Sequence, residues 1–259
     1  MKISIITVCK NASSDIEGTI LSVVNQSYQD YEYIIVDGDS NDGTKEIIER
    51  YRHFVDVYVS EKDRGIYSAM NKGILLSNGK YLLFLNAGDT LAGIDILSDI
   101  ARLWKDEDIV IGKIITDGYL VNPRWNTIID RYCLFCKSPP HQASFIKKDL
   151  FNKIGNYRES LVIFADWEYF LRAIIKFKCK LKQVDLIISY FQLGGISSQK
   201  KYYKLKHKEA ELLRREYYSF ITYIFYKLRY SVQRLYISGF IHLLKRTYMC
   251  ASKYLFERY

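Results

Sequence analysis

The sequence predicts an α/β fold in which a mostly parallel, Rossmann-like sheet is flanked by helices. Apolar runs at residues 3–8, 33–36 and 55–59 have the length and composition of buried strands, and segments with helical periodicity separate them. A β-α-β-α-β order of this kind implies parallel strands in one sheet. The first 60 residues therefore predict the core of the fold.

The second observation is the stretch 79–89, GKYLLFLNAGD, where a short apolar run ends on Asn86, Gly88 and Asp89. In open α/β sheets ligands bind outside the carboxyl ends of the strands. A carboxylate at that place can hold a hard divalent cation through oxygen, although Asn, Gly and Asp are also common turn residues. Asp89 is therefore a candidate metal ligand.

Helices are expected between these strands and after them. Ser14-Asp15-Ile16-Glu17 has the form of a capping box, and the apolar residues that follow on one helix face are Ile16, Ile20, Val23 and Val24. Asp42 or Thr44 is expected to cap the next helix. Further helices are predicted at 66–74, 94–104, 148–154 and from 163, and further strands at 109–115, 143–146 and 184–191. Residues 117–137 show no clear pattern.

Charge divides the 259 residues into two predicted regions, a domain at 1–199 and a helical C-terminal segment at 200–259. The first carries 24 Lys and Arg against 25 Asp and Glu, and the second carries 14 against 4, so the excess positive charge lies in the last quarter. Five cysteines predict reduced thiols in a cytosolic protein and not a disulfide framework. The N-terminal MKISIITV is expected to be a first strand and not a signal peptide.

The turn after the first strand, TVCKNASS, lacks the G-x-G-x-x-G pattern that lets backbone approach a pyrophosphate. A G-x-x-x-x-G-K-[ST] phosphate loop is also absent from the sequence. If a nucleoside diphosphate binds here, a metal ion and side chains must neutralise its charge.

Five motifs occur in order: ISIITVCKN, YIIVDGDSNDGT, DRGIYSAMNKG, YLLFLNAGD and FADWEYFLR. Together they resemble inverting glycosyltransferases of family 2, which have the GT-A fold. HQASF and LGGISS resemble the bacterial exopolysaccharide type, such as the colanic acid biosynthesis transferases. The resemblance covers about the first 199 residues.

The resemblance implies a nucleotide-sugar site. Asp37, which closes the second strand, corresponds to the residue that grips the nucleotide base. The other residues that it places at the donor are Thr7, Asn11, Asp63, Asn71, Lys72 and Asn86. Lys72 would add positive charge at the phosphates, although a lysine on a helix surface is commonly just solvated.

The metal and the base follow from the same resemblance. The family's D-x-D-D motif corresponds to residues 86–89, where only Asp89 is a carboxylate, so Mg²⁺ or Mn²⁺ would be held weakly and mostly through donor phosphates. The family's Glu-Asp pair corresponds to Ala165 and Asp166, which makes Asp166 the expected general base. An Asp at a helix start is also a common cap.

Three further residues are assigned to the acceptor or the diphosphate: His141, Gln142 and Trp167. The alternatives are a polar loop group for His141 and a core position for Trp167.

The resemblance implies inverting transfer of a sugar, with a UDP-sugar favoured over GDP-fucose, to a saccharide hydroxyl.

The C-terminal segment 200–259, here called the tail, carries uncharged runs of at most 10 residues, 217–226 and 235–244, half of the roughly 20 that span a bilayer. Its mixture of basic and aromatic residues predicts attachment to the inner face of the cell membrane, and hence a lipid-linked acceptor. Packing of the tail on the domain or in a dimer is the alternative.

Three other functions remain open on the residues alone. The Lys- and Tyr-rich tail suits a nucleic-acid binder, although no known nucleic-acid module is visible. A nucleotidyltransferase shares the sheet and the metal, but its Gly-rich first turn is missing. A catalytically silent family member would explain Asn86 and Ala165.

Overall fold

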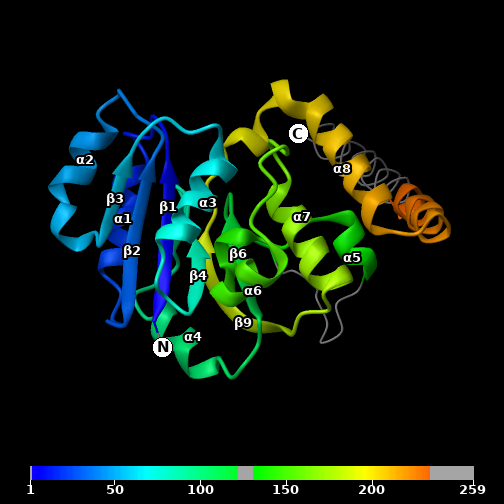
Figure 1. Ribbon diagram of the computed structural model, residues 1–259, viewed down its shortest axis with the longest axis horizontal. Coiled ribbons are helices and arrows are strands. Elements are labelled where there is room, and N and C mark those ends of the chain that lie inside the picture. Colours follow the sequence, from blue (N-terminus) through cyan, green and yellow to red (C-terminus); the bar gives the residue numbers. More distant parts are fainter. Residues whose placement is uncertain (1, 122–130, 234–259) are drawn as a thin grey trace, which may run out of the picture. The chain divides into compact units, whose positions relative to one another are not determined.

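A computed structural model describes residues 2–121 and 131–233 of the chain (Figure 1). It divides into two compact units, residues 1–213 and 214–259, so its division falls 14 residues after the predicted boundary at 199. The first unit contains all the described strands of the sheet.

Within the described residues the sheet has nine strands, of which eight form one path in the order β3-β2-β1-β4-β8-β6-β9-β5. The bounds are β1 Ile3–Cys9, β2 Tyr31–Asp37, β3 Val57–Ser60, β4 Tyr81–Phe84, β5 Thr90–Leu91, β6 Ile109–Thr116, β7 Tyr119–Val121, β8 Ser144–Lys147 and β9 Leu181–Tyr190. β8 pairs antiparallel with both β4 and β6, so β6 and its parallel neighbour β9 run in the same direction as β1 to β4. The predicted mostly parallel sheet is therefore confirmed.

The helices are α1 Ile16–Val24, α2 Thr44–Arg50, α3 Ile66–Leu76, α4 Ile96–Leu103, α5 Arg131–Cys136, α6 Lys148–Ile154, α7 Ala165–Leu171 and α8 Tyr203–Tyr217. A turn of π-helix, Arg172–Lys176, continues α7, and single turns of 3-10 helix lie at Arg52–Phe54, His141–Ala143, Ile196–Ser198 and Lys200–Tyr202. Every strand and helix expected within residues 1–199 is present, with its ends moved by a few residues. The unplaced stretch 117–137 contains β7 and α5, while residues 122–130 lie outside the described part.

The predicted capping box is wrong. α1 begins at Ile16 with Asp15 as its N-cap, and no side chain caps it. The Ser14 hydroxyl instead donates to the carboxylate of Asp15, because the helix starts one residue too late for Ser14 to reach its first free N–H groups. The expected cap of the next helix is also wrong, because Gly43 is the N-cap of α2 and no side chain caps it, although Asp42 Oδ1 accepts the N–H of Thr44, the first helical residue, at 3.1 Å.

The core explains why the strands were recognisable. All seven residues of β1 are buried, and so are all four of β4, which lies next to it. At the start of β4 the chain passes so close to β1 that a Cβ on Gly79 would lie 2.5 Å from the backbone nitrogen of Ser4. The buried carboxylate of Glu32 accepts the N–H of Gly79 at 2.8 Å and thereby fixes this approach.

Candidate active site

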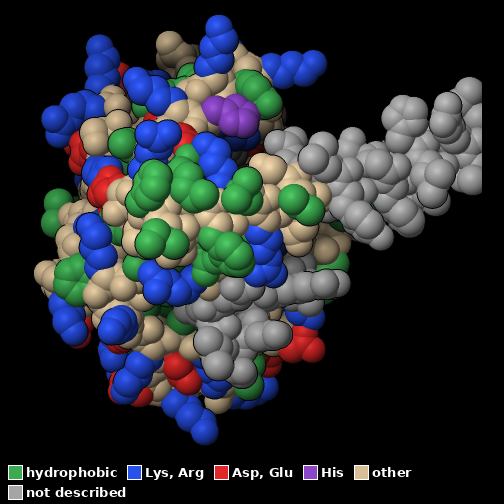
Figure 2. Space-filling view, turned by 90° about the vertical axis from the view of Figure 1, so that its right-hand side faces the viewer, with side chains coloured by type: hydrophobic (Ala, Val, Ile, Leu, Met, Phe, Trp, Pro, Cys, Tyr) green, Lys and Arg blue, Asp and Glu red, His purple; other side chains and the backbone are tan. Residues whose placement is uncertain are grey.

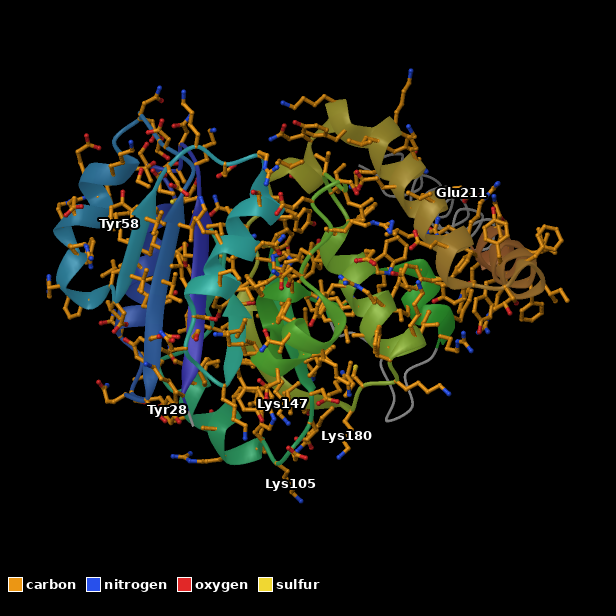
Figure 3. All side chains as sticks on the ribbon, in the orientation of Figure 1. Tyr28, Tyr58, Lys105, Lys147, Lys180 and Glu211 are labelled. Atoms are coloured by element: carbon orange, nitrogen blue, oxygen red, sulfur yellow. The ribbon has the colours of Figure 1, made fainter. Side chains whose placement is uncertain are left out.

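The carboxyl ends of six strands meet at one edge of the sheet, which lies toward the top of Figure 1, opposite the labelled N-terminus. Because β8 runs the other way, the turn that precedes it, His141–Ala143, reaches this same edge. The labelled Lys147 and Lys180 lie at the opposite edge, where both pair with Asp106 (Figure 3). The candidate site is therefore the edge that carries Asp89 and His141.

A hydrogen-bonded chain of three side chains occupies the centre of this edge. His141 Nδ1 lies 3.2 Å from Asp166 Oδ2, and His141 Nε2 lies 3.2 Å from Asn86 Nδ2. An amide nitrogen only donates, so Asn86 donates to Nε2 and the ring proton stands on Nδ1, directed at Asp166. The structure thus connects the predicted base to the turn after β4.

The same contacts set the charge on His141. Burial alone would lower the pKa of His141, but its hydrogen bond to Asp166 and the charges of Asp166 and Asp89 raise it above the ordinary value. The two carboxylates therefore favour the charged imidazole, in which Nε2 also carries a proton and no longer accepts from Asn86.

Tyr67 is the second partner of Asp166. Its hydroxyl lies 2.9 Å from Asp166 Oδ1 and 2.6 Å from the carbonyl oxygen of Ile163. Burial and then the charge of Asp166 raise the pKa of Tyr67 well above 10, so the hydroxyl stays protonated and donates. Each carboxylate oxygen of Asp166 therefore has its own partner, one from α3 and one from the turn before β8.

Asp89 is 4% exposed, and burial raises its pKa to about 7, against the opposing effects of His141 and the N–H of Gln192. Nearby, the Oδ1 atom of Asn86 is buried without a hydrogen-bond partner in the part of the chain that the structure describes. No three His, Cys, Asp or Glu residues gather as a metal site among those described residues. These two oxygen donors fit a divalent cation that takes its other ligands from a bound diphosphate and water.

Asp37 is fully buried at the end of β2, and its carboxylate is occupied within the protein. Its Oδ2 accepts the N–H of Ser40 at 3.0 Å and the hydroxyl of Ser60 at 2.6 Å, and the hydroxyl of Ser40 donates to Oδ1. Thr7 is also fully buried and donates to the carbonyl oxygen of Leu85. In this structure the polar groups of both residues are therefore bound within the protein.

Other predicted donor residues lie closer to the surface. Asp63 is half-buried, and a Cβ on Gly38 would lie 2.5 Å from its Oδ2, so Asp63 fills the space that Gly38 leaves. Asn11 has a left-handed backbone, with φ of 49°, and its Oδ1 accepts the N–H of Asn41. Lys72 pairs with Glu61.

Three predicted residues point into the protein. Asn71 donates to the carbonyl oxygen of Tyr157 and accepts its N–H at 3.0 Å, which ties α3 to the loop before α7. Gln142 is 4% exposed. Trp167 is 2% exposed, and its indole N–H donates to the carbonyl oxygen of Leu134, so it lies in the core.

The sequence did not single out Tyr67 or Glu209. Tyr67 lies among the apolar residues of α3, and its spacing resembles that of a core residue. Glu209 on α8 is 5% exposed, and its carboxylate accepts the N–H groups of Val162, Ile163 and Phe164 at 2.8 to 3.1 Å. No motif around Glu209, which lies between Lys208 and Ala210, predicts this contact.

The family model for glycosyl transferase family 2 matches residues 4–165. The chain belongs to this family. The matched segment ends one residue before Asp166, and it includes the turn after β4 and His141. The GT-A fold and membership of family 2 that the motifs predicted are therefore confirmed.

Relatives and solved structures agree with this assignment. A PGL/p-HBAD biosynthesis glycosyltransferase of Mycobacterium tuberculosis is 30% identical over 203 residues, which cover 75% of this chain and 78% of that protein. A cholesterol galactosyltransferase of Borreliella burgdorferi is 23% identical over 192 residues, 72% of this chain and 52% of that protein.

Among solved structures, S. aureus TarS 1-349 in complex with UDP-GlcNAc has a TM-score of 0.68 at 20% identity, and the match covers 83% of this chain and 66% of that one. The mannosyltransferase PcManGT of Pyrobaculum calidifontis, in complex with GDP-Man and Mn²⁺, has a TM-score of 0.61 at 17% identity, covering 82% and 62%. At these identities the likeness shows the fold.

Proposed function

We propose that this family 2 glycosyltransferase moves a sugar from a nucleoside diphosphate to an acceptor hydroxyl with inversion, and that Asp166 is the general base. The observation that carries the proposal is the chain Asp166–His141–Asn86, which sets a partnered carboxylate beside the turn that holds Asp89. Inversion in one displacement needs an acceptor that loses its proton on one face of the sugar while a diphosphate leaves from the other. Asp166 and the turn after β4 can supply these two separate roles.

The role of Asp166 follows from its chemistry. A carboxylate within hydrogen-bond distance of the acceptor hydroxyl takes its proton as the new bond forms, an effect typically worth about 10² to 10⁴ in rate. His141 and Tyr67 hold this carboxylate from behind, so its remaining lone pairs are available to the acceptor. Asp166→Asn should therefore leave the fold and the donor affinity intact and lower transfer at least about a hundredfold.

We further propose that Asp89 and the amide oxygen of Asn86 hold Mg²⁺ or Mn²⁺ together with the donor diphosphate. When bound, the cation stabilises the charge that develops on the leaving diphosphate. The support is that the carboxylate of Asp89 is buried and that Asn86, three residues earlier in the same turn, has a buried oxygen without a partner among the described residues. The relative PcManGT, crystallised with GDP-Man and Mn²⁺, agrees with this choice of metal.

A UDP-sugar is the donor that we favour, and TarS crystallised with UDP-GlcNAc supports this choice for the fold. The test is a panel of UDP-GlcNAc, UDP-glucose, UDP-galactose, GDP-fucose and GDP-mannose with Mn²⁺, read as thermal stabilisation and as release of the nucleoside diphosphate. Metal-dependent release that Asp166→Asn lowers at least about a hundredfold supports the proposal. Stabilisation without turnover for every donor would favour a catalytically silent protein.

For the acceptor we propose a lipid-linked saccharide in cell-surface polysaccharide synthesis, reached by docking of the C-terminal segment on the inner face of the membrane. Residues 220–233 are helical, and large apolar side chains gather on one face of this helix: Phe220, Ile221, Phe225, Leu228 and Val232 are each at least 60% exposed. Figure 2 shows apolar side chains in a band bordered by Lys and Arg. An exposed apolar face beside basic residues suits the headgroup boundary of an anionic membrane.

No helix in residues 2–121 or 131–233 is both long and apolar enough to span a membrane. Flotation of the full chain with vesicles of phosphatidylglycerol and of phosphatidylcholine tests the docking. Binding to the anionic vesicles that is lost in Phe220→Ser/Phe225→Ser supports it. A protein that ignores both kinds of vesicle would favour packing of this segment on protein.

A further inference from the structure

The carboxylate of Asp166 lacks the acidic neighbour that the family's Glu-Asp pair provides. Ala165 stands there, fully buried and without a polar group. Asp166 is instead hydrogen-bonded by residues from elsewhere in the chain: the hydroxyl of Tyr67 contacts Oδ1, and the imidazole of His141 contacts Oδ2. The orientation of Asp166 therefore depends on residues about 99 and 25 positions earlier in the sequence.

We propose that Tyr67 is a positioning residue for Asp166, whose hydroxyl aims the carboxylate at the acceptor in place of the missing glutamate. This inference rests on the proposed function, in which Asp166 is the base. It assigns Tyr67 no contact with substrate.

The geometry explains why the hydroxyl would matter. Its one proton is shared between Asp166 Oδ1 at 2.9 Å and the carbonyl oxygen of Ile163 at 2.6 Å, so Tyr67 ties the carboxylate to the backbone that leads into α7. With His141 on Oδ2, rotation of the carboxylate about its last side-chain bond would break one contact or the other. A base misplaced by about 1 Å can cost on the order of a hundredfold in rate, so a fixed carboxylate has a kinetic value.

The rest of Tyr67 has an ordinary core role. The side chain is 7% exposed, and its ring lies 5.7 Å, centroid to centroid, from the ring of Tyr157. Removal of the hydroxyl alone leaves this packing in place. Tyr67→Phe therefore separates the hydrogen bond from the contribution of the ring to the core.

Tyr157 offers a matched control. It is 3% exposed, belongs to the same aromatic cluster and lies near enough to Asp166 for that charge to raise its pKa. Its hydroxyl has no hydrogen-bond partner among the described residues. Tyr157→Phe thus deletes a buried hydroxyl close to Asp166 without removing a bond to it.

The test compares wild type, Tyr67→Phe and Tyr157→Phe with the nucleotide sugar that wild type turns over fastest in the donor panel. We expect Tyr67→Phe to lower kcat about tenfold or more, the loss that one charge-assisted hydrogen bond supplies, with the KM for the donor and the nucleotide-induced rise in Tm unchanged. Tyr157→Phe should keep kcat within about twofold of wild type.

A double-mutant cycle identifies the route of the effect. In the Asp166→Asn background, measured as single turnover at high enzyme concentration, Tyr67→Phe should cause no further loss. A kcat loss no larger than that of Tyr157→Phe, or an equal loss in both backgrounds, would overturn the inference. Full turnover by Asp166→Asn alone would instead overturn the proposed base, so the two failures are distinct.

Discussion

Glu209 on α8 is expected to stabilise the loop before Asp166, and its contribution to the free energy of unfolding follows from its hydrogen bonds. The carboxylate of Glu209 accepts three consecutive backbone N–H groups, those of residues 162–164. Glu209→Ala leaves all three without this acceptor. Val162 is 42% exposed, so water can reach its N–H, whereas Ile163 is 6% exposed, and its buried N–H loses the Glu209 carboxylate as acceptor.

Each buried donor left unsatisfied costs about 1 to 3 kcal/mol, or about 2 kcal/mol at the middle of that range. If the N–H of Val162 is rehydrated and the other two are not, Glu209→Ala should lower the free energy of unfolding by about 4 kcal/mol. For a domain of this size that corresponds to a fall in Tm of roughly 10 °C. Glu209→Gln keeps one acceptor oxygen and should lose about half as much.

The assay is thermal unfolding of the full chain, together with hydrogen exchange of the peptide that contains residues 160–168. Exchange of the amides at 162–164 should accelerate in Glu209→Ala. Glu216→Ala, an exposed acidic residue on the same helix, controls for the lost negative charge. A fall in Tm no larger than that of Glu216→Ala, or unchanged protection at 162–164, would refute the reasoning.

Three further predictions concern the proposed metal, the carboxylate of Glu32 and the close approach at Gly79. Removal of divalent metal with EDTA should abolish turnover, and Asp89→Ala should weaken the Mn²⁺-dependent stabilisation by nucleotide sugar; full activity in excess EDTA would exclude the metal role. Burial alone would raise the pKa of Glu32. Hydrogen bonds from Ser4 and two backbone N–H groups, together with the charge of Lys2, outweigh burial and lower this pKa below its ordinary value of 4.5. The ionised carboxylate therefore stabilises the fold above about pH 4.5, and this contribution is lost as pH falls. Glu32→Gln should therefore destabilise the protein at pH 7 and flatten its loss of stability between pH 5 and 3, as urea denaturation at each pH would show. Gly79→Ala would place a methyl group 2.5 Å from a backbone nitrogen, and we expect a loss of at least about 2 kcal/mol in the same measurement; wild-type stability would contradict the close approach.

Much of the fold could be predicted because burial on both faces leaves a strong signal. Runs such as IIVD in β2 and YLLF in β4 are nearly uniform in hydrophobicity, as strands covered on both sides are. β5 and β7 have only two and three residues, too few for a periodic pattern. The capping box failed because its pattern permits a start at Ser14, while contacts of Ala12 and Ser13 with the next loop set the observed one.

A candidate site residue could be predicted where one short motif contains both the residue and the strand or helix that positions it. Asp89 follows β4 directly, and Asp166 opens α7, so each was found from its own motif. The partners of Asp166 could not be found in this way. The direction of β8 brings His141 to the site edge, and α3 crosses near α7 to deliver Tyr67. Both facts belong to the topology of the sheet and have no local signature.

For Asp37 the sequence predicted the position at the end of β2 but not its hydrogen-bond partners. Asp37 does end β2 at the site edge, yet a carboxylate there can face a ligand or close the loop that follows it. The sequence carries a hint of the second arrangement, because Asp followed three residues later by Ser can accept that residue's N–H as a local turn does. Ser40 forms this bond, and Ser60 on the neighbouring strand completes the set.

Asp37 also connects two turns at this edge of the sheet. The hydroxyl of Ser40 also accepts the N–H of Asn11 at 2.7 Å, so Asp37 holds together the turns that follow β1 and β2. These internal hydrogen bonds of Asp37 stabilise the conformation of the loop. A nucleotide base that bound to the same carboxylate oxygens would first have to displace the hydroxyl groups of Ser40 and Ser60. The half-buried carboxylate of Asp63 lies beside the bare backbone of Gly38, with Oδ1 accepting the N–H of Gly65 at 2.9 Å and Oδ2 in the space that a Cβ on Gly38 would need. A side chain at Gly38 would therefore have to displace Asp63, so the arrangement of these loops depends on the absence of a side chain at Gly38 as much as on the internal partners of Asp37.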